Sequence, residues 1–201
     1  MSILLDAGPC LNFLAVGQQN ILIQVAASQD LQLAAPARVD VEVEGMTRDS
    51  RFHRTPALNT WRTLKSSKRL LILSDELSID GDDPLTAAVT RISGMPAKDR
   101  VDSPKSLGEI LVLAHASVFA QRGEQVFVLI DEADGRAKAK AEQEWLKRQE
   151  APGALDLWST PMVLQEADRR EAWIVKGLTW RQVYDQMRKF DDGLPPLRPR
   201  K

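Results

Sequence analysis

The amino-acid sequence predicts an α/β protein, a three-layer α/β/α sandwich in which helices cover both faces of a central parallel sheet of four to five strands. The first indication is that short apolar runs alternate with amphipathic stretches along the chain, as in successive strand and helix units. The second is that residues 3–5 and 126–130 are apolar without interruption, which is typical of strands buried on both faces. With 201 residues, 43% of them hydrophobic, the chain can enclose one good core.

Each predicted element follows from such a run or stretch. Strands are expected at residues 2–5, 31–34, 69–73, 125–130 and 155–158. Helices are expected at residues 9–16, where Gly17 ends the first one, at 20–27, from Pro36 through Val39 and Val43, and at 58–64, 85–92, 107–121, 135–149, 163–172 and 179–190.

The least regular segment lies between residues 74 and 106, with a polar turn at 79–84 and a loop at 94–105. Its density of Asp, Gly and Pro predicts the most mobile and least buried part of the chain. We therefore predict one domain over residues 1–172, with an irregular insertion at 74–106. Residues 173–201 are expected to form a helical extension packed on the same domain.

The balance of charge limits the classes of partner. Lys and Arg number 27 against 28 Asp and Glu, so the net charge of -1 gives no global basic field, and a nucleic-acid partner would need local basic patches. The single cysteine, Cys10, excludes an internal disulfide and suggests a reducing compartment. No apolar run approaches about 20 residues, so neither secretion nor membrane spanning is expected, and the sequence is typical of a cytoplasmic protein.

Four acidic residues stand at the ends of apolar runs or early in helices. Asp6 follows the first strand, Glu42 lies beyond Pro36, Glu109 opens an Ala-rich helix, and Asp131 follows the strand at 125–130. The carboxyl ends of parallel strands form the ligand site of such sheets, so these carboxylates are expected to converge. Converging carboxylates repel, and they either take up protons or bind a hard cation. The pattern therefore predicts a Mg²⁺ or Mn²⁺ site.

These stretches resemble, in order, the motif blocks of PIN-domain nucleases. The first block is Leu5-Asp6-Ala7-Gly8-Pro9-Cys10-Leu11-Asn12-Phe13, and the second is Pro36-Ala37-Arg38-Val39-Asp40-Val41-Glu42-Val43. The third runs from Leu107-Gly108-Glu109 to Ala114 and Ala116, and the fourth is Val128-Leu129-Ile130-Asp131-Glu132 with Arg136 and Ala139. Trp158-Ser159-Thr160-Pro161 with Leu164 and Ala167 is similar to the closing strand and helix of one bacterial branch.

The resemblance implies a metal-dependent endoribonuclease that hydrolyses RNA phosphodiester bonds, with Mg²⁺ or Mn²⁺ as cofactor. One form of this function is the toxin of a toxin–antitoxin pair, held inactive by a small cognate antitoxin protein; a homodimer is a further expected partner. The implied catalytic and metal-binding residues are Asp6, Glu42, Glu109 and Asp131, with Asp134 as an additional ligand. Arg136 and Lys138 are expected to meet a phosphate, and Thr160 to orient a ligand or water. Three bases of the irregular segment, Arg91, Arg100 and Lys105, are further candidates for an RNA backbone.

Structural roles compete with each of these assignments. Asp6 could cap the helix that follows it, Glu42 could be a solvated surface charge, Glu109 could be a favourable charge in a first helical turn, and Asp134 could cap the next helix. Many relatives with a Gly-Glu third block carry a second acid where this chain has Leu111.

Two other functional classes stay open. The departure at Leu111 and the tryptophans of the last third, Trp145, Trp158, Trp173 and Trp180, are compatible with a catalytically weak PIN-fold protein that binds RNA or protein. These tryptophans form either a satellite core or a docking surface. The second alternative is an unrelated phosphate-handling α/β enzyme. A haloacid-dehalogenase-like protein would need an aspartate two residues after Asp6, where this chain has Gly8.

Overall fold

A single five-stranded parallel sheet forms the centre of the protein. The structure is a computed structural model, and it describes residues 1–78, 83–103, 105–175 and 177–197. The strands are β1 (Ser2–Leu5), β2 (Gln32–Pro36), β3 (Leu70–Leu73), β4 (Gln125–Leu129) and β5 (Ala154–Trp158). They lie in the order β3-β2-β1-β4-β5, and every neighbouring pair is parallel. The predicted α/β fold with a central parallel sheet is confirmed, and each predicted strand is present within two residues of its expected bounds.

The order of the strands places a switch in connectivity beside β1. The chain builds the sheet outward from β1 through β2 to β3, and then returns to add β4 and β5 on the other side of β1. Leu5 of β1 is paired with Leu129 of β4, and the backbone N–H of Asp6 donates to the Leu129 carbonyl at 3.3 Å. Ligands bind at such switch points in open α/β sheets, at the carboxyl ends of the strands. Asp6 stands at that position.

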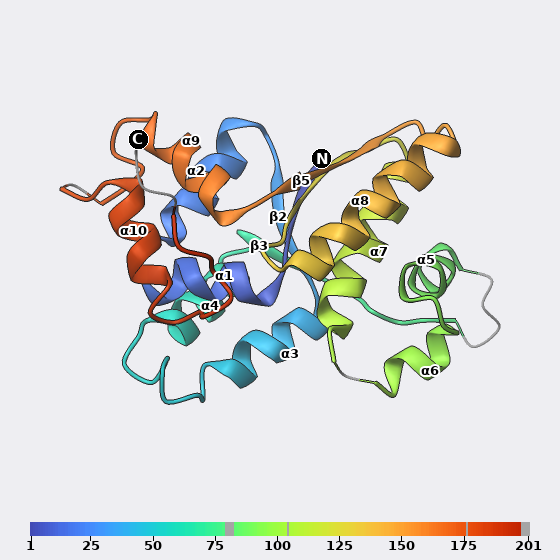
Figure 1. Ribbon diagram of the computed structural model, residues 1–201, viewed down its shortest axis with the longest axis horizontal. Helices are drawn as coiled ribbons and strands as arrows, with labels where there is room; N and C mark the ends of the chain where they lie inside the picture. The colour runs from blue at the N-terminus through green and yellow to red at the C-terminus, as the bar shows by residue number, and fades with distance from the viewer. Residues whose placement is uncertain (79–82, 104, 176, 198–201) are drawn as a thin grey trace.

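Helices cover both faces of the sheet (Figure 1). They are α1 (Ala7–Ala15), α2 (Gln19–Ser28), α3 (Ala37–Met46), α4 (Ala57–Ser66), α5 (Pro84–Ser93), α6 (Ala97–Val101), α7 (Leu107–Gln121), α8 (Ala133–Arg148), α9 (Thr160–Asp168) and α10 (Trp180–Met187). Helices α7 and α8 lie on one side of the sheet, and α1, α2 and α9 lie on the other, with α10 outside them. Helices α5 and α6 lie beyond α7.

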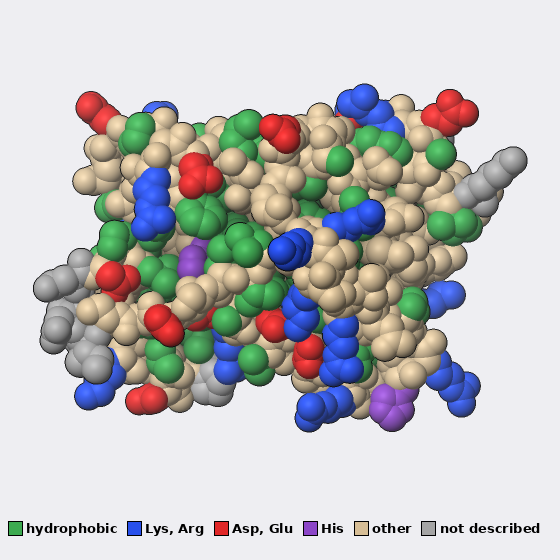
Figure 2. All heavy atoms as spheres, turned by 180° about the vertical axis from the view of Figure 1, so that it is seen from behind, with side chains coloured by type: hydrophobic (Ala, Val, Ile, Leu, Met, Phe, Trp, Pro, Cys, Tyr) green, Lys and Arg blue, Asp and Glu red, His purple; other side chains and the backbone are tan. Residues whose placement is uncertain are grey.

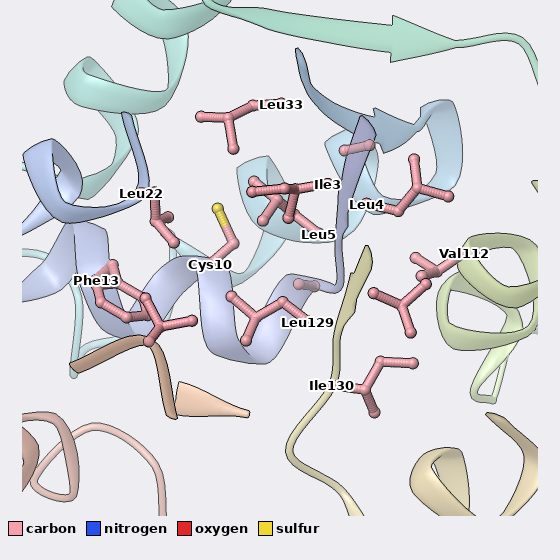
Figure 3. Packing of buried hydrophobic residues seen from close by; sticks show 14 of the residues in the cluster. Ile3, Leu4, Leu5, Cys10, Phe13, Leu22, Leu33, Val112, Leu129 and Ile130 are labelled. Carbon is pink, nitrogen blue, oxygen red and sulfur yellow. The ribbon is translucent and has the colours of Figure 1, made fainter. Parts of the chain in front are cut away.

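The main core surrounds β1. Ile3, Leu4 and Leu5 are at most 1% exposed, as expected for a central strand covered on both faces. Figure 3 shows these side chains packed among residues of α1, α2, β2, α7 and β4, including Cys10, Phe13, Leu22, Leu33, Val112 and Leu129. Cys10 is a free, fully buried thiol, and burial raises its pKa well above the usual range. It therefore acts as a small apolar core residue.

The segment between residues 74 and 106 is more ordered than its composition predicts. Helix α6 occupies part of the expected loop, and Ala88, Val89 and Ala97 are buried against α7 in a second hydrophobic cluster. Helix α7 is apolar on every side, and these residues cover its outer face. Most of the other described residues between 74 and 106 are exposed or partly exposed, as expected. Residues 79–82 of the predicted polar turn lie outside the described residues.

This second cluster explains the apolar residue at position 111. Leu111 is 3% exposed and belongs to the cluster that α5 and α6 build against α7. Position 111 therefore faces the added helices, where an acid would be buried without a partner.

The C-terminal extension shares the main core. Val183, Tyr184 and Met187 of α10 are buried within it, and the Asn12 amide of α1 donates to Asp191 at 2.7 Å. The tryptophans of the last third, at positions 145, 158, 173 and 180, are partly buried and pack against the same core. These tryptophans therefore extend the main core and do not form a separate satellite core.

The surface carries both signs of charge. Figure 2 shows Lys and Arg side chains interspersed with Asp and Glu side chains over one face of the molecule. In the part of the chain that the structure describes, no single helix is long and apolar enough to cross a membrane. Helices α1 and α2 reach that length and apolarity only as a pair, bent by 116°.

Candidate functional site

A pocket lined largely by carboxylates opens at the carboxyl end of β1. It has a volume of about 220 Å³ and is here called the acidic pocket; its lining residues are Asp6, Ala7, Gly8, Glu42, Met46, Ser106, Glu109 and Glu132. Four chain segments that are far apart in the sequence each contribute one carboxylate. Three of the four predicted acids, Asp6, Glu42 and Glu109, therefore line one pocket.

Asp6 lies in the acidic pocket directly after the central strand β1. Its side chain is 8% exposed, and although it holds the N-cap position of α1, it makes no capping hydrogen bond. Burial, with a smaller contribution from the charges of Glu109, Glu42 and Glu132, raises the pKa of Asp6 to about 7, and the neighbouring Ala7 N–H partly opposes the rise. The geometry thus gives no support to the capping role and shows an acid held among other acids.

Glu42 is separated from the other acids of its helix by its partners. Asp40 and Glu44 both bind Lys65 of α4, at 2.6 and 3.0 Å, and so face away from the pocket. Glu42 instead accepts from Arg38 at 2.9 Å, one turn earlier on α3. A β-carbon on Gly108 would come within 3.0 Å of the Glu42 carboxyl carbon. The absence of a side chain at Gly108 therefore leaves space for Glu42. Glu42 is packed at the pocket and is not a fully solvated surface charge.

Glu109 lies in the first turn of α7 and is 5% exposed. Burial raises its pKa, and the ammonium of Lys138, 3.2 Å from Oε1, partly opposes that rise. A β-carbon on Gly135 would come 2.5 Å from the Glu109 carboxyl carbon. A charge that served only the helix dipole would be left in solvent. The close fit against α8 instead fixes this carboxylate beside the pocket.

The fourth acid of the pocket is Glu132, and the predicted Asp131 lies outside the lining. The Asp131 carboxylate accepts from the Thr160 backbone N–H at 2.8 Å and from the Thr160 hydroxyl at 2.5 Å. Burial raises the pKa of Asp131, and these two hydrogen bonds oppose the rise. Asp131 therefore ties the end of β4 to the start of α9. Thr160 is fully buried and engaged in the same contact, so the structure does not place it to orient a ligand.

Of the predicted substrate-binding residues, Arg136 holds strand ends together and Lys138 contacts an acid of the pocket. The guanidinium of Arg136 donates to the carbonyls of Ile130 and Trp158, at 3.1 and 3.4 Å, and so joins the ends of two strands. Lys138 binds Glu109 and also Asp134, whose side chain is 74% exposed and does not line the pocket. Of the three bases predicted in the irregular segment, Arg100 is buried and donates to the carbonyls of Ser103 and Lys105.

Asp75, which follows β3, supports the helix that carries Glu42. Its carboxylate accepts from the Arg38 backbone N–H at 2.5 Å, near the N-terminus of α3, and lies 2.9 Å from Nε2 of His115 on α7. A carboxylate at a helix N-terminus satisfies a free N–H group and complements the helix dipole. The role of Asp75 could not be predicted from local sequence, because its partners lie 37 and 40 positions away.

Comparison of the chain with protein-family models, with curated proteins and with solved structures gives no match in any of the three. Any assignment therefore rests on the residues themselves. Within the described ranges, no three His, Cys, Asp or Glu side chains lie close enough together to hold one metal ion. The donor set of the acidic pocket consists of carboxylate oxygens, which are nevertheless the ligands that Mg²⁺ and Mn²⁺ prefer. The pKa of Asp6 is raised mainly by its burial, and the charges of Glu109, Glu42 and Glu132 add to the rise.

Proposed function

We propose that this protein is a Mg²⁺- or Mn²⁺-dependent endoribonuclease whose active site is the acidic pocket. The observation that carries the proposal is the gathering of Asp6, Glu42, Glu109 and Glu132 at the switch point of the sheet, where burial and mutual repulsion raise the pKa of Asp6 to about 7. A protein gains nothing in stability from such a cluster, so a functional cation is the physical reason to keep it.

The residues of the pocket would divide the work. Asp6, Glu42, Glu109 and Glu132 would hold the divalent cation, which supplies a water of lowered pKa and stabilises charge on the leaving oxygen of a phosphodiester. Lys138, already within 3.2 Å of Glu109, would exchange that carboxylate for a phosphate oxygen of the substrate. Arg38 would balance the charge of Glu42 until the cation binds. No side-chain nucleophile is required, which agrees with a buried Cys10 and with a His115 engaged by Asp75.

A second candidate function has an observation of its own. Lys138 and Arg38 already neutralise Glu109 and Glu42 through ion pairs, and the described carboxylates are not arranged around a single point. A catalytically weak PIN-like protein that binds RNA without cleaving it would use the same surface with these ammonium and guanidinium groups in place of metal ions. The toxin role, the small antitoxin and the homodimer stay predictions that follow from the resemblance.

Cleavage of RNA distinguishes the two functions. Wild-type protein is incubated with a mixed population of RNAs in Mg²⁺, in Mn²⁺ and in chelator, beside Glu132→Gln and Asp134→Asn. The nuclease proposal expects metal-dependent cleavage that Glu132→Gln reduces by about two orders of magnitude or more. Asp134→Asn, which removes an exposed acid two residues away, is expected to retain most activity. RNA binding without cleavage in any metal would favour the second function instead.

A further inference from the structure

A second pocket, of opposite character, adjoins the acidic one. It has a volume of about 230 Å³ and is here called the basic pocket; its lining residues are Arg91, Ile92, Lys138, Ala141, Glu142, Trp145 and Arg148. Lys138 lines this pocket, and its ammonium binds Glu109 of the acidic pocket at 3.2 Å. The two pockets are therefore linked by a single ion pair.

The one carboxylate of the basic pocket is used to hold Arg91. Glu142 is 3% exposed and accepts from Arg91 through both oxygens, at 2.5 and 3.2 Å. The Ser117 hydroxyl accepts a third hydrogen bond from the same guanidinium at 3.0 Å. Arg91 is thereby fixed by three bonds, and the charge of Glu142 is neutralised. Lys138 and Arg148 are left to give the pocket its positive character.

The guanidinium of Arg91 is stacked on one face of the Trp145 ring, and the pair is here called the Arg91–Trp145 plate. The guanidinium carbon of Arg91 lies 3.5 Å from the centroid of the Trp145 ring, which is a stacked cation–π contact. Trp145 is held from below by its packing on the main core. The outer face of the guanidinium in this plate is planar, and unpaired nucleobases stack on guanidinium planes as they do on aromatic rings.

Arg148 is the free cation at the edge of this plate. It is exposed, and among the residues that the structure describes its side chain makes no hydrogen bond or ion pair. Its guanidinium is therefore available to a phosphate, as is Lys138 when it leaves Glu109. The pocket thus combines a stacking surface with two phosphate-binding groups.

We infer that the basic pocket binds one nucleotide of single-stranded RNA, with its base on the Arg91–Trp145 plate and its phosphate at Arg148 and Lys138. This inference rests on the proposed nuclease function, because it places that nucleotide next to the bond that would be cleaved in the acidic pocket. It also specifies the substrate class: unpaired RNA is bound, because a base within a duplex cannot reach the plate.

Binding measured without metal tests the inference separately from cleavage. The anisotropy of a labelled single-stranded RNA of about ten nucleotides is titrated with wild-type protein in chelator, beside Arg148→Glu and Lys147→Glu. Lys147 is the matched control, because it is an exposed base of the same helix that lines a different pocket. We expect Arg148→Glu to weaken binding about fivefold or more, and Lys147→Glu to change it by less than about twofold. Arg148→Gln should make the slope of log affinity against log salt concentration shallower by roughly one, because one phosphate contact is lost.

The stacking surface is tested by two substitutions of one residue. Trp145→Leu should weaken binding by roughly 5- to 100-fold, and Trp145→Phe, which keeps an aromatic face, should retain most of it. Thermal unfolding of each variant shows whether the fold is kept; should Trp145→Leu unfold, the Arg148 and Lys147 pair still decides the matter.

Three outcomes would overturn the inference: equal weakening by Arg148→Glu and Lys147→Glu, equal binding of duplex and single-stranded RNA, or displacement of RNA by an acidic peptide as effectively as by unlabelled RNA. If wild-type protein cleaves RNA but Arg148→Glu leaves binding unchanged, the inference is wrong and the nuclease proposal still holds. Binding through this pocket without any cleavage would support it while the nuclease proposal failed.

Discussion

The carboxylate of Glu109 lies directly against the α-carbon of Gly135, so that a β-carbon at that position would come 2.5 Å from its carboxyl carbon and 2.8 Å from a methyl group of Ile130. This contact joins the first turns of α7 and α8 and fixes the position of the Glu109 carboxylate. The same device recurs once, where Gly108 makes room for Glu42. Two of the four pocket acids are thus positioned by glycines on neighbouring segments.

Gly135→Ala should therefore disturb the pocket. Replacing a glycine inside a helix by alanine usually stabilises by about 0.5–1 kcal/mol, and Gly45→Ala in α3, where nothing lies within 4 Å, should show that gain. At position 135 the new methyl group must displace Glu109 and Ile130, and we expect a net loss of about 1 kcal/mol or more. Urea denaturation of both variants measures the difference. A gain at position 135 equal to that at position 45 would show that Glu109 is not held by this contact.

The dependence of stability on pH should report Asp6. Its pKa is about 7 in the folded protein and near 3.8 when unfolded. Below about pH 4 both states are protonated; as the pH rises toward 7 the unfolded state loses the proton first, so folding is progressively disfavoured. The full shift corresponds to about 4 kcal/mol lost between pH 4 and pH 7. Asp6→Asn should be more stable than wild type at about pH 8 and should lack this slope in metal-free urea titrations.

If Asp6→Asn is instead strongly destabilised at every pH, Asp6 has a structural role that the described contacts do not show. The matched control is Asp134→Asn, whose carboxylate is exposed and should leave the slope unchanged.

The contact between Asp131 and Thr160 should be structural. Thr160→Val removes the hydroxyl that donates to Asp131 and leaves a buried carboxylate oxygen without a partner, which costs about 1–3 kcal/mol. Metal affinity should change little, because neither residue lines the acidic pocket. Calorimetric titration with Mn²⁺ checks the second statement. A loss of Mn²⁺ binding in Thr160→Val with the fold intact would return Asp131 to the metal site.

Asp75→Ala should weaken the support of α3. It removes an acceptor from the Arg38 N–H and from His115, and a lost partner of this kind costs about 1–2 kcal/mol. His115→Gln, which can keep one hydrogen bond to Asp75, should cost less. Thermal unfolding of the two variants gives the order of these effects, and equal losses would mean that the helix N-terminus contributes nothing.

Most of the fold could be predicted because its strands are read directly from continuous apolar runs. The apolar runs at residues 3–5 and 126–130 predict central strands, and Asp6 marks the end of the first strand. Helix α6 was missed because five residues rich in charge carry too little periodicity to be recognised. Its burial comes from the unusually apolar α7, a partner that local sequence does not reveal.

At the end of β4, the sequence does not show which of two adjacent acids, Asp131 or Glu132, lines the pocket. Asp131 and Glu132 are adjacent and of like charge, and successive residues leaving a strand point to opposite sides. Which one faces the pocket depends on Thr160, 29 positions later, which binds Asp131 and leaves Glu132 free to face it. The structural role of Arg136 could not be predicted for a similar reason. Its acceptors are backbone carbonyls, and the sequence does not reveal where these lie.

The most direct test of the central claim, that the acidic pocket is a divalent-cation site, is thermal unfolding at about pH 8 with increasing Mn²⁺. Wild-type protein should gain stability by mass action, about 2.7 kcal/mol when the free ion reaches one hundred times its Kd. Asp6→Asn should start more stable without metal, because a buried charge is removed and the repulsion between the acids is relieved, and it should gain much less from the ion. A wild-type protein that Mn²⁺ does not stabilise, or an Asp6→Asn variant that gains as much as wild type, would contradict the account.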